Sequence, residues 1–166
     1  MYPRVGYDAS EGLSTLSLYY EDFTVGVEHV TRGRTITESD VVNFAGLSGD
    51  FVELHTNEEY ARQAPFGKRI AHGLLTLSIS SGLMTQMNLV TDTVIAFYGI
   101  DKLRFVKPVF MGDTVHVRKK VIDAMAKSSE MGVVTFETTV LNQNGEAVLV
   151  YRDKLAIKKR KTDVGS

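Results

Sequence analysis

A segment of twenty residues without a charged side chain, from Ala71 to Val90, most constrains what this chain can fold into. Its length would suit a membrane span. However, polar side chains recur along it from His72 to Asn88, and a lipid-facing helix rarely carries so many. The segment is therefore predicted to form a helix buried in protein. At about 100° per residue, its side chains divide into a mixed small and polar face (Gly73, Leu77, Ser80, Ser81, Met84) and an apolar face (Leu75, Ile79, Leu83).

A long apolar helix needs a large apolar surface to cover it, and the second half of the chain offers one. Four segments rich in Val, Ile, Thr, Phe and Tyr follow one another without an intervening helix: Thr93 to Val106, Thr114 to Ala126, Val133 to Asn142 and Ala147 to Lys158. Asn144-Gly145 predicts a tight hairpin turn with positive φ angles, and Gly112-Asp113 and Met131-Gly132 mark the other connections. The class is therefore α+β, with an antiparallel sheet wrapped around a central helix.

The first half of the chain reads as a strand followed by two short helices. Val27 to Ile36 is β-like. Thr37, with Asp40 three residues on, predicts the start of one helix. Asn57 predicts the start of a second helix over Glu58 to Gln63, which has acids in its first turn.

Composition narrows the classes of function. A chain of 166 residues with formal net charge −1 suits one soluble domain and gives no sign of a nucleic-acid partner. With no Cys, disulfides and thiolate chemistry are excluded. The N-terminus does not resemble a signal peptide, so we expect a cytoplasmic protein that contacts no membrane. The predicted division is a lead-in over 1–18, a domain over 19–160 and a tail over 161–166.

Two candidate catalytic side chains lie close together before the buried helix. Asp50 and His55 are five residues apart on a predicted loop, and Gly73 opens the helix, so an acid and an imidazole could face an oxyanion site. His72 is interpreted as a structural hydrogen-bonding residue. His29 and His116 are interpreted as surface residues. No ligand spacing typical of a metal is present, so no metal is predicted.

Several ordered motifs resemble those of the MaoC-type acyl dehydratases, the family of (R)-specific enoyl-CoA hydratases. The similarity runs from about Tyr19 to Lys158. The motifs are Tyr20-Glu21-Asp22-Phe23 with Gly26, Arg34 to Glu38, Phe44 to Asp50, His55, Ala61, Phe66-Gly67, Ile70 to Gly73, Ser81-Gly82-Leu83, Phe105 to Val109 and Gly112-Asp113.

This resemblance implies a single hot-dog domain, a homodimer or higher homo-oligomer, and an acyl tunnel near the subunit interface. It implies a reversible hydration of a trans-2-enoyl-CoA to an (R)-3-hydroxyacyl-CoA, with the CoA thioester as substrate and no further cofactor. Asp50 would be the main general base, and His55 would orient the water. The amide of Gly73 would bind the enolate oxygen, and Ser81 would support the acid/base pair.

One departure from the family and two other functions stay open. Val52-Glu53 stands where the family motif has Asn-Pro, which makes Glu53 a candidate for substrate specificity. A hot-dog thioesterase is one alternative, although such an enzyme typically carries its acid on a helix. A non-catalytic acyl-CoA-binding or accessory subunit is the other. The residues do not decide the acyl chain length, or whether CoA or acyl carrier protein is the carrier.

Overall fold

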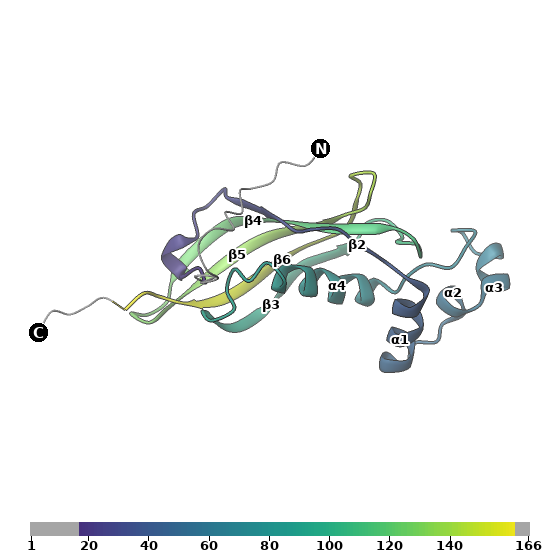
Figure 1. Ribbon diagram of the computed structural model, residues 1–166, viewed down its shortest axis with the longest axis horizontal. Coiled ribbons are helices and arrows are strands. Elements are labelled where there is room, and N and C mark those ends of the chain that lie inside the picture. The colour runs from purple at the N-terminus through teal and green to yellow at the C-terminus, as the bar shows by residue number, and fades with distance from the viewer. Residues whose placement is uncertain (1–16, 162–166) are drawn as a thin grey trace, which may run out of the picture.

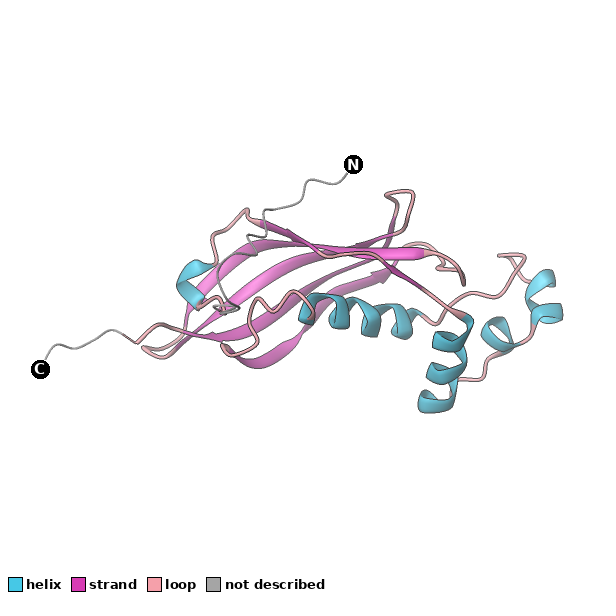
Figure 2. Ribbon diagram, viewed as in Figure 1, coloured by secondary structure: helices cyan, strands magenta, loops and turns pink. Residues whose placement is uncertain are grey.

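The computed structural model describes residues 17–161, which form one antiparallel sheet with helices on one side and at one end (Figures 1 and 2). The sheet order is β1-β4-β5-β6-β3, and the two-residue strand β2 also pairs with β4. The strands are β1 (Glu28–Val30), β2 (Arg34–Thr35), β3 (Val94–Phe105), β4 (Thr114–Ala126), β5 (Met131–Leu141) and β6 (Ala147–Lys158). The helices are η1 (Tyr20–Asp22), α1 (Glu38–Ser48), α2 (Glu53–Thr56), α3 (Glu58–Gln63) and α4 (Gly73–Thr85).

Helix α4 lies along one face of the sheet, whereas α1, α2 and α3 lie together beyond its N-terminal end (Figure 1). The prediction of an antiparallel sheet around a long central helix is confirmed. No helix within residues 17–161 is long and apolar enough to cross a membrane.

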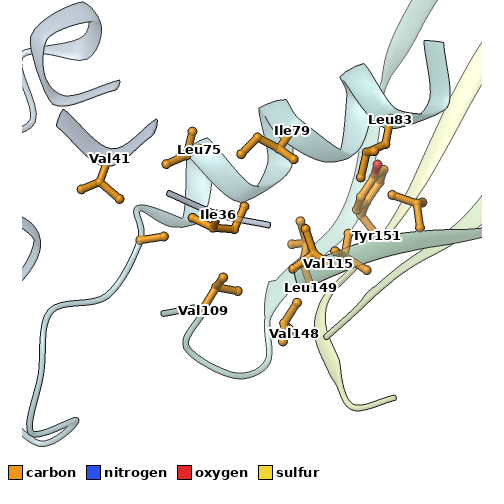
Figure 3. Packing of buried hydrophobic residues seen from close by; sticks show 13 residues of the cluster. Ile36, Val41, Leu75, Ile79, Leu83, Val109, Val115, Val148, Leu149 and Tyr151 are labelled. Atoms are coloured by element: carbon orange, nitrogen blue, oxygen red, sulfur yellow. The ribbon is translucent and has the colours of Figure 1, made fainter. Parts of the chain in front are cut away.

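The apolar face predicted for α4 is the face that packs on the sheet. Leu75, Ile79 and Leu83 are buried and belong to one cluster with Leu149 and Tyr151 of β6 (Figure 3). Burying a Leu or Ile side chain contributes about 1.5–3 kcal/mol. Contact with the sheet therefore stabilises a helix that has no charged side chains of its own.

Two helix starts have the predicted caps. The Thr37 hydroxyl accepts the Asp40 amide at 3.2 Å, and the Asp40 carboxylate accepts the Thr37 amide at 2.8 Å, so α1 begins with a capping box. The Asn57 side chain accepts the amide of Tyr60 at 3.2 Å and caps α3. Both caps were predictable from the sequence, because each depends on a side chain of a particular type directly before the helix.

Helix α4 is shorter than predicted because it ends at Thr85 rather than Val90. Asn88 follows with φ 55°, a left-handed conformation that a helix cannot contain and that Asn tolerates better than most residues. The β-like segment from Val27 to Ile36 is also interrupted. In that interval the Thr31 amide donates to the Val117 carbonyl at 2.9 Å, and the Thr31 hydroxyl accepts the amide of Val117 at 2.9 Å.

Two turn predictions need correction. In the hairpin between β5 and β6, Gly145 has φ 75° while Asn144 does not have a positive φ, so the turn differs from the predicted Asn-Gly type. Met131-Gly132 lies inside β5, and the connection before it is Lys127 to Glu130. Gly132 leaves room for the Tyr20 ring, since a Cβ there would lie 2.2 Å from that ring.

The predicted lead-in and tail fall mostly on 1–16 and 162–166, outside the described residues. The last two lead-in residues are packed against the domain. The Ser17 hydroxyl donates to the Asp92 carboxylate at 3.1 Å, and the Leu18 amide donates to the Leu89 carbonyl at 2.7 Å. The packed domain therefore includes residues before the predicted boundary at 19.

Candidate active site

The turn after α1 directs Asp50 toward the N-terminal end of α4. Helix α1 ends at Ser48 and is capped by Gly49, which has φ 78° and whose amide donates to the Ala45 carbonyl at 2.8 Å. Glycine takes this left-handed conformation without steric cost, and the chain leaves the helix there. Asp50 follows directly and is half-buried. Within residues 17–161 its carboxylate accepts a single long bond, 3.4 Å from the Val52 amide, so it can still bind a ligand.

His55 projects from the one-turn helix α2 with its tautomer fixed. Its Nδ1 lies 2.8 Å from the carbonyl oxygen of Ile70. Because a carbonyl can only accept, Nδ1 carries the proton. In the neutral imidazole Nε2 is then left to accept a hydrogen bond, and a water molecule can donate it.

His72 is buried between these groups and has a structural role, as the sequence indicated. Its Nε2 donates to the Asp50 carbonyl at 3.0 Å, which ties the Asp50 loop to the start of α4. Its ring stacks on His55 with centroids 3.9 Å apart. Its Nδ1 is buried and has no hydrogen-bond partner among residues 17–161. One buried acceptor beside the catalytic candidates is thus left without a partner in the described residues.

Gly73 begins α4, and no acceptor within residues 17–161 pairs with its amide N–H. The first amides of a helix lack partners by geometry, and the helix dipole makes that end attractive to an anion. A Cβ at this position would lie 2.7 Å from the ring of Phe105. Close approach of a substrate to the backbone is one reason for a glycine at this position. Packing against Phe105 is by itself a sufficient reason.

Asp50, His55, His72, Gly73 and Phe105 line one cavity of about 410 Å³, the site cavity. The predicted acid, imidazole and helix start are therefore brought together. Their arrangement can hold a water next to a base and present an N–H to a developing negative charge.

Two other candidates lie outside the site cavity. Ser81 lines a second cavity of about 400 Å³, the apolar cavity, farther along α4. Ser81 lies eight positions after Gly73, which is about 12 Å along the helix. Glu53 is exposed and accepts a hydrogen bond from the Asn57 side chain at 2.9 Å. Among residues 17–161 of one chain, neither residue lines the site cavity with Asp50 and His55.

Asp50, His55 and His72 have the residue types of a metal site, and one ligand atom from each lies within 4.8 Å of the others. Two of the four imidazole nitrogens are already engaged, because His55 Nδ1 bonds the Ile70 carbonyl and His72 Nε2 bonds the Asp50 carbonyl. The His55 and His72 rings are also stacked with an interplanar angle of 30°, so their nitrogen lone pairs do not converge well. We assign no metal to this site.

A cluster of polar side chains in the apolar cavity was missed from the sequence. Lys119, Asp153 and Tyr151 line it, together with His29. His29 had been interpreted as a surface residue, but it is half-buried, as is His116. Lys119 occupies an inward position on a strand where the alternating neighbours are buried valines, Val117 and Val121. That break in an apolar alternation was the available signal.

The fold and the family of this chain follow from its similarity to known proteins. The fold matches a protein of Mycobacterium tuberculosis described as having a double hotdog fold, with TM-score 0.77 and 20% identity over 90% of this chain and 46% of that one. This is the hot-dog fold. The MaoC like domain model matches residues 23–144, and the chain belongs to that family.

Relatives in this family carry enzymatic and regulatory names. The chain is 39% identical over 122 residues to the (R)-specific enoyl-CoA hydratase of Rhodospirillum rubrum, covering 73% of this chain and 79% of that protein. It is 42% identical over 100 residues to Protein MaoC of Klebsiella aerogenes, but this match covers 60% of the chain and only 29% of that protein. A solved structure titled monoamine oxidase regulatory protein, from Archaeoglobus fulgius, has TM-score 0.83 and 40% identity, covering 87% and 97%.

Proposed function

We propose that this protein is an acyl-thioester hydratase that adds water reversibly to a trans-2-enoyl-CoA and forms an (R)-3-hydroxyacyl-CoA. The convergence of the Asp50 carboxylate, the accepting nitrogen of His55 and the unpaired Gly73 amide on one cavity carries the proposal. The hydratase and dehydratase names of its relatives support the same reaction class. We place the reaction in the cytoplasm.

In this mechanism Asp50 and His55 hold one water molecule between them. Asp50 removes a proton as the water oxygen bonds to Cβ, and the electron pair of the double bond moves toward the thioester oxygen. The Gly73 amide donates to that enolate oxygen, aided by the dipole of α4. A proton then returns to Cα, so that H and OH have been added across the double bond.

His72 supports this chemistry as a positioning residue. Its bond to the Asp50 carbonyl fixes the loop that carries the base, and its ring packs against the imidazole of His55. The second candidate function, a thioesterase, is not supported by the position of Asp50. Such an enzyme typically carries its acid on a helix, whereas Asp50 lies on a loop beyond the end of α1. The intact acid/base pair also argues against a non-catalytic role.

We further propose that the working enzyme is a homodimer formed through β3. This strand is 12 residues long and pairs only with β6 among the described strands, so its other edge is free. Large apolar side chains along it are exposed: Val94, Ile95, Phe97, Tyr98 and Phe105. An exposed, long apolar edge is a template for pairing, and two copies would pair about a two-fold axis.

Such a dimer would join the two cavities. The end of β3 at Phe105 borders the site cavity, and its first half, at Val94 and Phe97, borders the apolar cavity. Antiparallel pairing of two copies of β3 sets these ends side by side. The site cavity of one subunit then opens toward the apolar cavity of its partner, which would receive the acyl chain. Ser81 would reach the catalytic pair from the partner.

The reaction is tested by mixing the purified protein with enoyl-CoA esters of graded length and following the loss of the conjugated thioester absorbance. Asp50→Asn and His55→Gln should each lower turnover by about 10²–10⁴-fold, and the double variant by little more, because both act on one water. Asp123→Asn removes an exposed carboxylate of β4 and should have no effect. Turnover near wild type in either site variant would contradict the proposal.

The shared site is tested by co-expressing Asp50→Asn subunits with Met84→Trp subunits, in which the indole fills the apolar cavity. Each homodimer should be inactive on an eight-carbon ester. A mixed dimer keeps one intact site, so random pairing should restore about a quarter of wild-type activity. If each site belonged to one subunit, no mixture would recover activity.

A further inference from the structure

A row of polar side chains crosses the inner face of the sheet beneath the apolar cavity. We call His29, Lys119, Thr138 and Asp153 the polar row; they come from β1, β4, β5 and β6. His29 is paired with Lys119 and Lys119 with Thr138 in the strand register. Lys119 Nζ donates to one Asp153 carboxylate oxygen, and the Thr138 hydroxyl donates to the other at 2.7 Å.

Fold stability does not explain this row. The Lys119 and Asp153 side chains are 9% and 1% exposed, so their ion pair is nearly removed from water. Replacing such a pair with apolar residues is often neutral or stabilising, because two charges have been desolvated. The inward neighbours Val117 and Val121 show that valine fits the same strand face.

The row has hydrogen-bonding capacity that the described residues do not use. The Lys119 ammonium has three N–H donors, and Asp153 is its only hydrogen-bond acceptor among residues 17–161. Its Nζ also lies 4.3 Å from the centre of the Phe136 ring. Lys119, Asp153 and His29 all line the apolar cavity, whose other walls are mainly aliphatic and aromatic.

The charges in the row favour a neutral ligand. Lys119 and Asp153 balance one another, so a carboxylate placed there would add an uncompensated charge in a poorly solvated space. Burial, and next the charge of Lys119, lower the pKa of His29, which keeps that imidazole neutral near pH 7. Burial raises the pKa of Tyr151 to about 12, so this neighbour is neutral as well.

We propose that the polar row binds an uncharged oxygen, a hydroxyl or a keto group, on the distal part of the substrate's acyl chain. Lys119 donates to that oxygen, and Asp153 or His29 accepts from it when it is a hydroxyl. A plain hydrocarbon chain of equal length leaves the row's donors unpaired and binds less well. This inference rests on the proposed hydratase function and names its substrate class.

The test compares kcat/KM for three series of 2-enoyl-CoA esters with six to ten carbons: unsubstituted, ω-hydroxylated and ω-carboxylated. Wild-type protein should prefer the ω-hydroxylated ester at one chain length by about 10²-fold, since a site built to bind a hydroxyl discriminates strongly against its absence. Equal or better use of the unsubstituted series would overturn the inference. Preference for the carboxylated series would overturn it too.

A paired variant assigns the preference to the row. Lys119→Met with Asp153→Leu removes both charges and should reduce the preference for the hydroxylated ester at least tenfold. The matched control, Arg152→Met with Glu137→Leu, removes an exposed ion pair between β5 and β6 and should keep the preference. A preference that survives in the Lys119 and Asp153 variant would overturn the inference. If that variant does not fold, the comparison of the three ester series with wild-type protein still tests the inference.

The four-carbon unsubstituted ester separates this inference from the proposed function. If it is hydrated but no hydroxyl preference exists at longer chain lengths, the function stands and the inference fails. If no ester is hydrated, calorimetry with saturated acyl-CoA esters, with and without an ω-hydroxyl, still measures the preference of the cavity. Equal affinities would then overturn the inference.

Discussion

The two ends of helix α4 hold polar groups of opposite kinds. At its N-terminal end, the Gly73 amide and His72 Nδ1 have no partners among residues 17–161. Along its second half, the polar groups are paired: the Ser80 hydroxyl bonds the Tyr151 hydroxyl at 3.0 Å, and Lys119 bonds Asp153. Groups without a partner are suited to a reaction that creates new charge, whereas the balanced Lys119 and Asp153 pair, with ammonium donors to spare, is suited to selecting a neutral ligand.

The backbone differs between the two ends as well. Asp50 and His55 are carried by a loop and a single helical turn, and the conformation there is set by Gly49 and by bonds to carbonyl oxygens. Lys119 and Asp153 are carried by long central strands. We therefore expect substitutions near the catalytic end to change rates, and substitutions in the polar row to change stability when they leave one charge alone.

The largest effect on stability is expected for Lys119→Met alone. It leaves the buried Asp153 carboxylate with the Thr138 hydroxyl as its only hydrogen-bond donor among residues 17–161. Breaking a buried pair in this way typically costs about 3–5 kcal/mol in the free energy of unfolding. Adding Asp153→Leu should recover most of that loss. Urea unfolding of both variants measures these changes in the free energy of unfolding. If Lys119→Met alone were as stable as wild type, the pair would not be isolated from water.

A smaller effect is expected for Gly73→Ala, which brings a Cβ to 2.7 Å from the Phe105 ring. Overpacking of this kind typically costs about 1–3 kcal/mol in stability. Adding Phe105→Leu should relieve the contact and restore the melting temperature. If activity remains low in the double variant, the glycine also serves close approach of the substrate. If activity returns fully, Phe105 alone accounts for the glycine.

The smallest effect concerns pH. Burial, and then the charge of Lys119, lower the pKa of His29 below its unfolded value of 6.5. The unfolded chain therefore binds the proton more readily, so this contribution to stability is complete above pH 6.5 and is lost as the pH falls through the folded pKa. His29→Gln should weaken the decline in urea midpoint between pH 7.5 and 5, roughly the window of this titration. His116 also has a lowered pKa, but it is present in both wild type and His29→Gln. If the urea midpoint fell equally with pH in the two proteins, His29 would not be the source of the decline.

Much of the fold was predictable because it depends on local pattern. The bounds of β4 and β6, and the starts of α1 and α3, were read from alternation and capping residues. The end of α4 was not, because it depends on the backbone conformation of Asn88, and an uncharged run does not reveal where a helix stops.

The part of the candidate site that was predicted also depends on residues close together in the sequence. Asp50 and His55 are near in sequence and both line the cavity beside Gly73, although His55 lies on the one-turn helix α2 and not on the predicted loop. The polar row joins residues from four strands, and only their pairing across the sheet reveals it. Ser81 shares the helix with Gly73 but lines another cavity, so its predicted role requires a second subunit. No sequence pattern within one chain specifies which residues meet across a two-fold axis.

The order of elements along the chain has a consequence for synthesis on the ribosome. Helix α4 ends at Thr85, whereas β6, whose Leu149 and Tyr151 cover it, ends at Lys158. At about 5–20 residues per second, the 73 residues between these ends take roughly 4–15 s to make. An uncharged, apolar helix is therefore complete while its cover is still missing. During that interval the nascent chain is a natural client for chaperones, and slower translation prolongs its exposure.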